Sequence, residues 1–587
     1  MNIIKNNIFR ITWGFFFIFV LFFIYINYNV PEIRYNLYSF HYIIIFVSFL
    51  LILFIKNPFK QIDYKKMLIS FFLTFIYFLC SISNIFIEYL NNSDYNLISY
   101  YLLFTMSMAS TFTLIYYILN LNLTCKPASE KLCLILLSII SSILILVVLT
   151  TFTGLYDLMI FDAWYSFSEF KEVSNWHGLG WSTTVALCRI IFSTPYPIVI
   201  LQLLCFIYFL KQSIFFIGKK SKLGVILFSI LILTNVSLLD SVRLLLPDTL
   251  CSICFFGFVL NLLFIIINYN VSLKNYIILT FAGIIIVTFR HATFFPIIIT
   301  LLVLLFISII KKEKESFKRI FLPTITIFLV KVFIFDIIIT NIFNVVKYDK
   351  VHPYTIPLYI MSSLVYNDVI DNDEYLESVN NIIPIDLIKS NYSKYIPDTL
   401  LRDWSVDREY IEHINKIPTF DILSLNFRLF LEYPFEFLYE FFCMNNILWS
   451  FTDLYSDMYI VDLTDLYQPE ASCFFDDYDE KYPIIVRNTI LLKPINALFT
   501  KLYSIDCFRP FLLRNGVYAF LILLSSIILI LKKHTKVLLS LLPIYLYFFL
   551  LMLSIQATAT RYILPFMLIS NFIIIFSITL DNKNPPV

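Results

Sequence analysis

The sequence predicts an all-α polytopic membrane protein with about fourteen membrane-spanning helices and a mostly helical domain outside the cytoplasm. Its 587 residues are 59% hydrophobic and only 14% charged, whereas soluble domains carry about 25% charged residues. Apolar runs of about twenty residues, the length that crosses a bilayer, recur along the chain. One long region, 343–515, interrupts them and has the Pro, Asp, Asn and Tyr content of a folded domain.

The apolar runs give the expected order of spans along the chain. They cover residues 11–29, 39–55, 67–88, 97–119, 132–153, 184–210, 223–239, 249–268, 275–289, 293–310, 320–342, 516–531, 537–556 and 561–580. No small-residue cleavage site follows the first run, so we expect a retained helix there. Four parts result: amino-terminal spans in 1–153, a membrane core in 154–342 whose first outward loop is 154–183, the polar domain 343–515, and carboxyl-terminal spans in 516–587.

Short basic runs set the expected orientation. Lys5 and Arg10 precede the first span, and lysine runs recur in loops of the same parity, ending with Lys532, Lys533 and Lys536. Since cytoplasmic loops are rich in Lys and Arg, both termini are expected in the cytoplasm of a multi-pass plasma (inner) membrane protein. The region 343–515 contains 26 acidic and 14 basic residues, which agrees with an extracytoplasmic place.

The first outward loop concentrates polar residues among aromatic ones. It reads MIFDAWYSFSEFKEVSNWHGLGWSTT and contains Asp162, Glu169, Glu172 and His177. If 162–175 is helical, its three acids lie on one face. Asp162 is then a candidate general base or acceptor-orienting carboxylate. An amphipathic helix lying in the lipid headgroups explains the same pattern, and the residues alone leave both interpretations open.

Further segments follow this loop in a recognisable order, and together they resemble a known family. The segments are YPIVILQLLCF, LLPDTLCSICF, TFRHATFF, the helical stretches of the large domain and, near the end, ATATRYILPF. They resemble the bacterial polytopic glycosyltransferases of the GT-C type, most closely the DUF6020 branch near the O-antigen glucosyltransferases (GtrII-like), over about residues 155–570. Departures occur at Gly178, Pro247 and Ala292, where the family tends to have Pro, Lys, and Asn or Gly.

The resemblance implies a GT-C-like fold and a sugar donor linked to polyprenyl phosphate, used at the outer face. The leaving group is then an anionic lipid phosphate, which a guanidinium can hold with two hydrogen bonds. The candidate donor-phosphate residues lie at outward helix ends: Arg243, Asp248, Arg290, His291, Arg561 and Tyr562. A snorkelling interfacial arginine is the alternative for each Arg. No metal site or cofactor is predicted, and assistance by a divalent cation stays open.

Other polar residues give weaker signals. Lys331 and Asp336 lie inside an apolar run but five positions apart, which does not place them on one face of an α-helix, so Asp336 is expected to be capped or paired. Cys251 and Cys254 lie one helical turn apart without a second pair of ligands, which indicates packing. The acidic run at 476–480 lacks calcium-loop spacing and is expected to be solvated.

The predicted activity is transfer of a sugar from a polyprenyl-phosphate-linked donor to a cell-surface glycan or lipid acceptor. Membrane lipids are further partners, and no basic block indicates nucleic acid. Nucleotide-binding and hydrolase motifs are missing from the sequence. Two rivals stay open. One is a transporter or flippase of lipid-linked saccharides, which would place charges at mid-membrane. The other is a catalytically inactive scaffold of the same fold.

Overall fold

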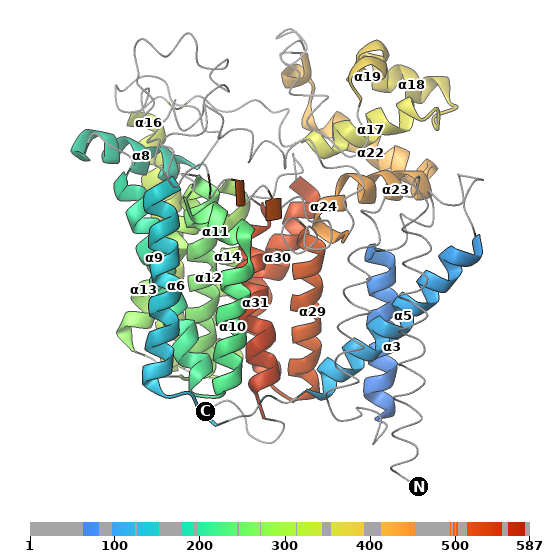
Figure 1. The fold of residues 1–587 in the computed structure, drawn as a ribbon. Coiled ribbons are helices and arrows are strands. Elements are labelled where there is room, and N and C mark those ends of the chain that lie inside the picture. The colour runs from blue at the N-terminus through green and yellow to red at the C-terminus, as the bar shows by residue number, and fades with distance from the viewer. Residues whose placement is uncertain are drawn as a thin grey trace.

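The computed structural model describes most of the chain, and every regular element in the described residues is helical (Figure 1). These residues are 63–81, 97–121, 126–151, 178–192, 196–243, 246–269, 272–312, 314–342, 354–392, 413–451, 514–554 and 562–581, with the isolated positions 123, 345, 494, 497–498 and 501–502. The prediction of an all-α protein is therefore confirmed for them.

Six described helical stretches are long and apolar enough to cross a membrane: Glu130–Val148, Tyr196–Gly218, Pro247–Ile266, His291–Ile310, Phe317–Ile342 and Thr535–Ser554. Shorter apolar helices pack among them. The expected spans at 11–29 and 39–55 lie outside the described residues. The total of fourteen therefore stays a prediction.

The helices form a bundle with smaller helices at one of its ends (Figure 1). The bundle up to the large polar region contains α3 (Tyr64–Ser81), α5 (Leu97–Asn120), α6 (Glu130–Thr151), α8 (Leu179–Phe192), α9 (Tyr196–Gly218), α10 (Lys222–Thr234), α11 (Val236–Arg243), α12 (Pro247–Ile266), α13 (Leu273–Phe289), η3 (His291–Thr293), α14 (Phe294–Ile310), α15 (Lys314–Leu329), the π-helix η4 (Val330–Ile339) and α16 (Thr340–Ile342). After that region follow α29 (Asn515–Leu531), η7 (Thr535–Val537), α30 (Leu538–Ser554) and α31 (Leu564–Thr579).

Helix α12 forms the centre of the bundle. Its sequence is apolar on all sides, and such a helix is stable only where neighbours cover it completely. All but its last residue are buried, and it packs against α13, α9, α31 and α30. Helix α31 is buried along its whole length in the same way. Segments distant in sequence therefore meet around α12.

Two of the expected continuous spans are wrong, because each is divided into two helices. The run 184–210 is split between α8 and α9, and Pro197 stands in the first turn of α9, where a proline is tolerated but an unbroken helix is disfavoured. The run 223–239 breaks at Asn235, whose side chain accepts a hydrogen bond from the backbone N–H of Leu238 and so caps α11. Hydropathy alone does not detect such breaks.

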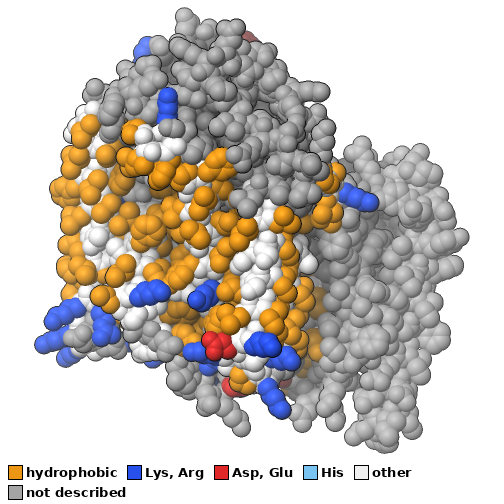
Figure 2. All heavy atoms as spheres, turned by 60° about the vertical axis from the view of Figure 1, so that its left-hand side comes forward, with side chains coloured by type: hydrophobic (Ala, Val, Ile, Leu, Met, Phe, Trp, Pro, Cys, Tyr) orange, Lys and Arg blue, Asp and Glu red, His pale blue; other side chains and the backbone are white. Residues whose placement is uncertain are grey.

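The two ends of the bundle differ. The helices α17 (Thr355–Tyr366), α18 (Asp373–Asn380), α19 (Ile385–Asn391), α22 (Thr419–Glu432), α23 (Pro434–Met444) and α24 (Asn446–Trp449) lie at one end, the domain end (Figure 1). Helices α17, α18, α19, α22 and α23 share a hydrophobic core of their own. At the other, which we name the lysine end, lysine and arginine side chains gather below a belt of hydrophobic ones (Figure 2).

A buried lysine completes the last helix at the lysine end. The Lys532 Nζ donates hydrogen bonds to the backbone oxygens of Ser577 at 3.0 Å, Ile578 at 3.1 Å and Leu580 at 2.7 Å. The final carbonyls of a helix have no partner within the helix, and a cation there also complements the helix dipole. Lys532 therefore fixes the end of α31 to the end of α29.

Replacing Lys532 with Met should lower the free energy of unfolding by about 2 kcal/mol, the usual loss for hydrogen bonds to a charged group. Chemical unfolding of the purified protein in detergent measures it. Lys533→Met is the matched control, because Lys533 is the exposed neighbour. Equal stability of the two variants would show that the three carbonyl contacts contribute nothing.

Candidate functional site

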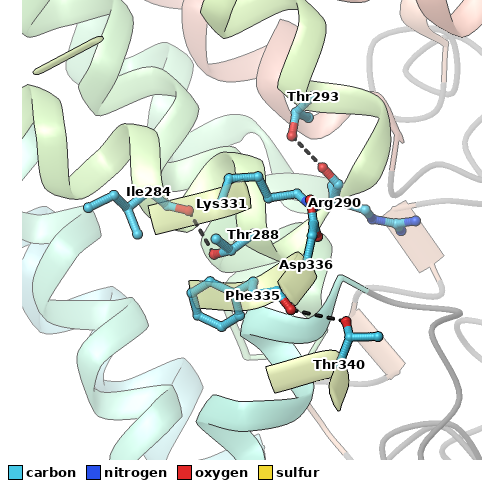
Figure 3. Close-up of polar contacts among 8 residues, drawn as sticks. All are labelled: Ile284, Thr288, Arg290, Thr293, Lys331, Phe335, Asp336 and Thr340. Atoms are coloured by element: carbon cyan, nitrogen blue, oxygen red, sulfur yellow. Dashed lines mark hydrogen bonds and ion pairs between the residues drawn. The ribbon is translucent and has the colours of Figure 1, made fainter. Parts of the chain in front are cut away.

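The chain turns sharply at Arg290, at the domain end. Arg290 ends α13 with an extended backbone, and η3 and α14 follow it. The Thr293 hydroxyl lies 2.7 Å from the backbone oxygen of Arg290 (Figure 3). It lies at the same distance from that of Ile286, and so closes the turn. The backbone beneath Arg290 is thereby held in one conformation.

Arg290 forms an ion pair with Asp248 of α12, through Nη2 and Oδ2. Asp248 follows Pro247 in the first helical turn, where a proline is preorganised and a carboxylate is favoured by the helix dipole. The side chains are 17% and 5% exposed respectively, so both charges are largely removed from water. Such a pair persists because each charge compensates the other.

Two tyrosines complete the surroundings of the guanidinium. Its central carbon lies 5.3 Å from the centre of the Tyr562 ring, a cation–π contact. Tyr547 of α30 is close enough to both Arg290 and Asp248 for electrostatic interaction, and its ring stacks on Phe566 at 5.8 Å. The Nε of Arg290 has no hydrogen-bond partner among the described residues. The guanidinium therefore has a buried N–H donor that no described residue satisfies.

Three of the six predicted donor-phosphate residues, Asp248, Arg290 and Tyr562, thus meet in one place. His291 follows Arg290 and is exposed. Arg243 is the last residue of α11, and its side chain lies outside the described part, as does Arg561 altogether. The predicted catalytic residues Asp162, Glu169, Glu172 and His177 also lie outside the described residues. Their distance from Arg290 stays untested.

The described chain resumes at Gly178, beside the turn and within the last part of the first outward loop. The backbone N–H of Gly178 donates to the Phe289 oxygen at 3.1 Å. Trp181 is completely buried, with its ring 5.4 Å from that of Phe289. Gly178, which follows the candidate residue His177 in the chain, is therefore hydrogen-bonded to the residue that precedes Arg290.

A second ion pair corrects one sequence expectation. Lys331 Nζ contacts Asp336 Oδ1 within η4. Five positions separate them, and the turn of a π-helix, unlike that of an α-helix, returns to the same face after about five residues. The expectation that they do not share a face was wrong, whereas Asp336 is indeed paired. In Figure 3 the Arg290 guanidinium points away from this pair.

Sequence reasoning missed Tyr547 completely. The chain contains 39 tyrosines, and this one lies in an ordinary apolar run, so no sequence signal distinguishes it.

Cys251, expected to serve packing, is buried one helical turn after Asp248, with its Sγ 3.9 Å from the Ile286 oxygen. Among the described residues, no group of three or more His, Cys, Asp and Glu could hold a metal ion.

Comparison of the chain with protein-family models, characterised proteins and solved structures gave no match.

Proposed function

We propose that the protein is a membrane glycosyltransferase of the GT-C type. It transfers a sugar from a polyprenyl-phosphate-linked donor to a glycan or lipid acceptor at the extracytoplasmic face of the plasma membrane. The observation that supports this most is the convergence of Asp248, Arg290 and Tyr562 at the domain end of the bundle. Charged side chains within membrane-spanning segments are rare and typically functional.

The geometry around Arg290 suits a lipid phosphate. Asp248 pairs with Nη2 of the guanidinium, and the guanidinium lies over the face of the Tyr562 ring. These two contacts fix the orientation of its remaining N–H donors. A guanidinium can bind phosphate oxygens through parallel hydrogen bonds, which are strong in water-poor surroundings. Donors fixed in advance also stabilise charge that develops on a leaving phosphate without reorganisation.

The lysine clusters and the domain helices lie at opposite ends of the bundle (Figures 1 and 2). With lysines in the cytoplasm, the domain end, and with it Arg290, faces the outside. This orientation is part of the proposal, together with the fourteen spans. Gly178 supports the proposed role of the outward loop, because its hydrogen bond to Phe289 holds this part of the loop beside Arg290. Asp162 would act on the acceptor, with Glu169, Glu172 and His177 nearby.

The test measures transfer of radiolabelled sugar from a polyprenyl-phosphate donor by purified protein in liposomes. Asp162→Asn should lower the turnover by about a hundredfold or more, the usual contribution of a general base. Lys274→Ala is the matched control and should keep full activity. Lys274 lies 5.1 Å from the Tyr208 ring at the end of α13 opposite to Arg290, so its replacement removes a charged side chain far from the proposed site.

The same liposomes separate the rivals. Movement of the labelled lipid between leaflets without release of its sugar would establish a flippase and contradict the proposal. The assay is also run with every donor and acceptor fraction of the native membrane supplied. If the labelled lipid then neither moves between leaflets nor transfers its sugar, the protein is an inactive scaffold.

A further inference from the structure

The span Phe317–Ile342 presents a continuous apolar stripe on its exposed side. Leu322, Ile325, Leu329, Phe333 and Ile337 are exposed by 64%, 37%, 41%, 50% and 45%. Only 22% of the most apolar part of this span is buried inside the protein. An apolar surface of this kind on a membrane-spanning helix is in contact with lipid.

Asp336 interrupts this stripe. Its side chain is 43% exposed, whereas that of Lys331 is 10% exposed. Lys331 occupies Oδ1, and no described residue donates a hydrogen bond to Oδ2. One carboxylate oxygen of Asp336 therefore accepts no hydrogen bond from a described residue, on a surface that is otherwise apolar.

The π-helical form of η4 is what brings the pair together. Thr340 donates its hydroxyl to the Phe335 oxygen five residues earlier at 3.1 Å, so the wide turn also continues beyond the pair (Figure 3). π-Helical segments are rare and frequently occur at functional sites. The wide turn joins a buried cation to an exposed anion on one face.

The pair lies at the depth of the Arg290 turn. A Cβ added to Gly283 would meet Ile327 Cδ1 at 2.4 Å, so α13 and α15 touch at this level. Arg290 lies seven residues further along α13, about 10 Å at the rise of an α-helix. Asp336 lies nine residues beyond Ile327, partly in the shorter rise of η4, and η4 packs against α13. The end of a membrane-spanning helix borders the headgroup layer.

We propose that Lys331 and Asp336 form a binding site for a zwitterionic aminophospholipid with a primary ammonium, such as phosphatidylethanolamine. The headgroup ammonium donates to the free Oδ2 of Asp336, and the lipid phosphate lies toward Lys331. The acyl chains lie along the stripe from Phe333 to Leu322. This inference is independent of the proposed glycosyltransferase activity.

The charges favour this headgroup over other common ones. The protein pair is neutral overall and has its anion on the exposed side, so it complements a neutral headgroup with an outer cation. A quaternary ammonium, as in phosphatidylcholine, has no N–H to donate. An anionic headgroup such as phosphatidylglycerol would meet the exposed carboxylate with repulsion.

The experiment measures lipid binding by native mass spectrometry of the full chain in equimolar phosphatidylethanolamine, phosphatidylcholine and phosphatidylglycerol. The wild type should retain phosphatidylethanolamine preferentially. Asp336→Asn should weaken that preference about tenfold, as expected for loss of a charge-assisted hydrogen bond.

The exchanged variant K331D/D336K is a second test of the proposal. It keeps an ion pair within the helix but places the cation on the exposed side. It should bind phosphatidylglycerol in preference to phosphatidylethanolamine. Equal retention of the three lipids by the wild type would overturn the proposal. So would a folded exchanged variant with unchanged preference, since the pair would then serve only the helix.

Discussion

Replacing Arg290 with Ala should both destabilise the protein and strongly reduce sugar transfer. The change leaves the buried Asp248 carboxylate without a counter-charge, and breaking such a pair costs about 3–5 kcal/mol. Loss of a donor that stabilises developing phosphate charge should lower turnover a further hundredfold or more. Chemical unfolding and the liposome transfer assay measure the two effects separately.

A double variant separates these effects. Asp248→Leu with Arg290→Met removes both charges, and apolar replacement of a buried ion pair is often neutral or stabilising. We therefore expect unfolding close to that of the wild type, but no transfer. Asp248→Asn alone should keep the Arg290 cation and retain part of the activity. Full transfer by the stable double variant would exclude Arg290 from donor binding.

The sequence could predict that Arg243, Asp248 and Arg290 lie at helix ends, because hydropathy marks where apolar runs begin and end. It could not predict contacts among those residues. Asp248, Arg290 and Tyr562 were grouped through a family resemblance, whereas their actual contact depends on how α12, α13 and the start of α31 pack. Tyr547 enters from α30 with no local signal.

Two errors have a common physical origin. The expected span 184–210 assumed that an apolar run is one helix, and the interpretation of Lys331 and Asp336 assumed α-helical periodicity. Both the break before α9 and the π-helix η4 are features of the backbone. Lipid solvates all apolar runs alike, so hydropathy contains no information on them.

Glycine positions are more informative about the site, because only nine glycines occur in the chain. Gly178 allows α8 to begin directly against the end of α13. A Cβ built there would lie 2.0 Å from the Thr288 oxygen and 2.6 Å from the Phe289 carbonyl carbon. Both are backbone atoms of a hydrogen-bonded helix end, so no side-chain rotation relieves the clash.

Gly178→Ala should therefore displace the start of α8 from Phe289 and break the 3.1 Å hydrogen bond between them. We expect destabilisation of at least about 3 kcal/mol, the upper range for overpacking, because the backbone itself must move. Sugar transfer should fall strongly as well, since Gly178 follows His177 in the outward loop and Arg290 follows Phe289. Unfolding and transfer are measured as for Arg290.

Gly283→Ala is the matched comparison on the same helix. There the added Cβ meets the flexible end of Ile327, with Cδ1 at 2.4 Å, and Ile327→Val removes that atom. The double variant Gly283→Ala, Ile327→Val should regain most of the lost stability and transfer sugar normally. No second substitution can relieve the clash at Gly178 in this way, because the atoms nearest to its added Cβ are backbone atoms of Thr288 and Phe289. If Gly178→Ala proved as mild as the relieved pair, α8 would not be held against Arg290 in the membrane, and the proposed link between the outward loop and the arginine would be lost.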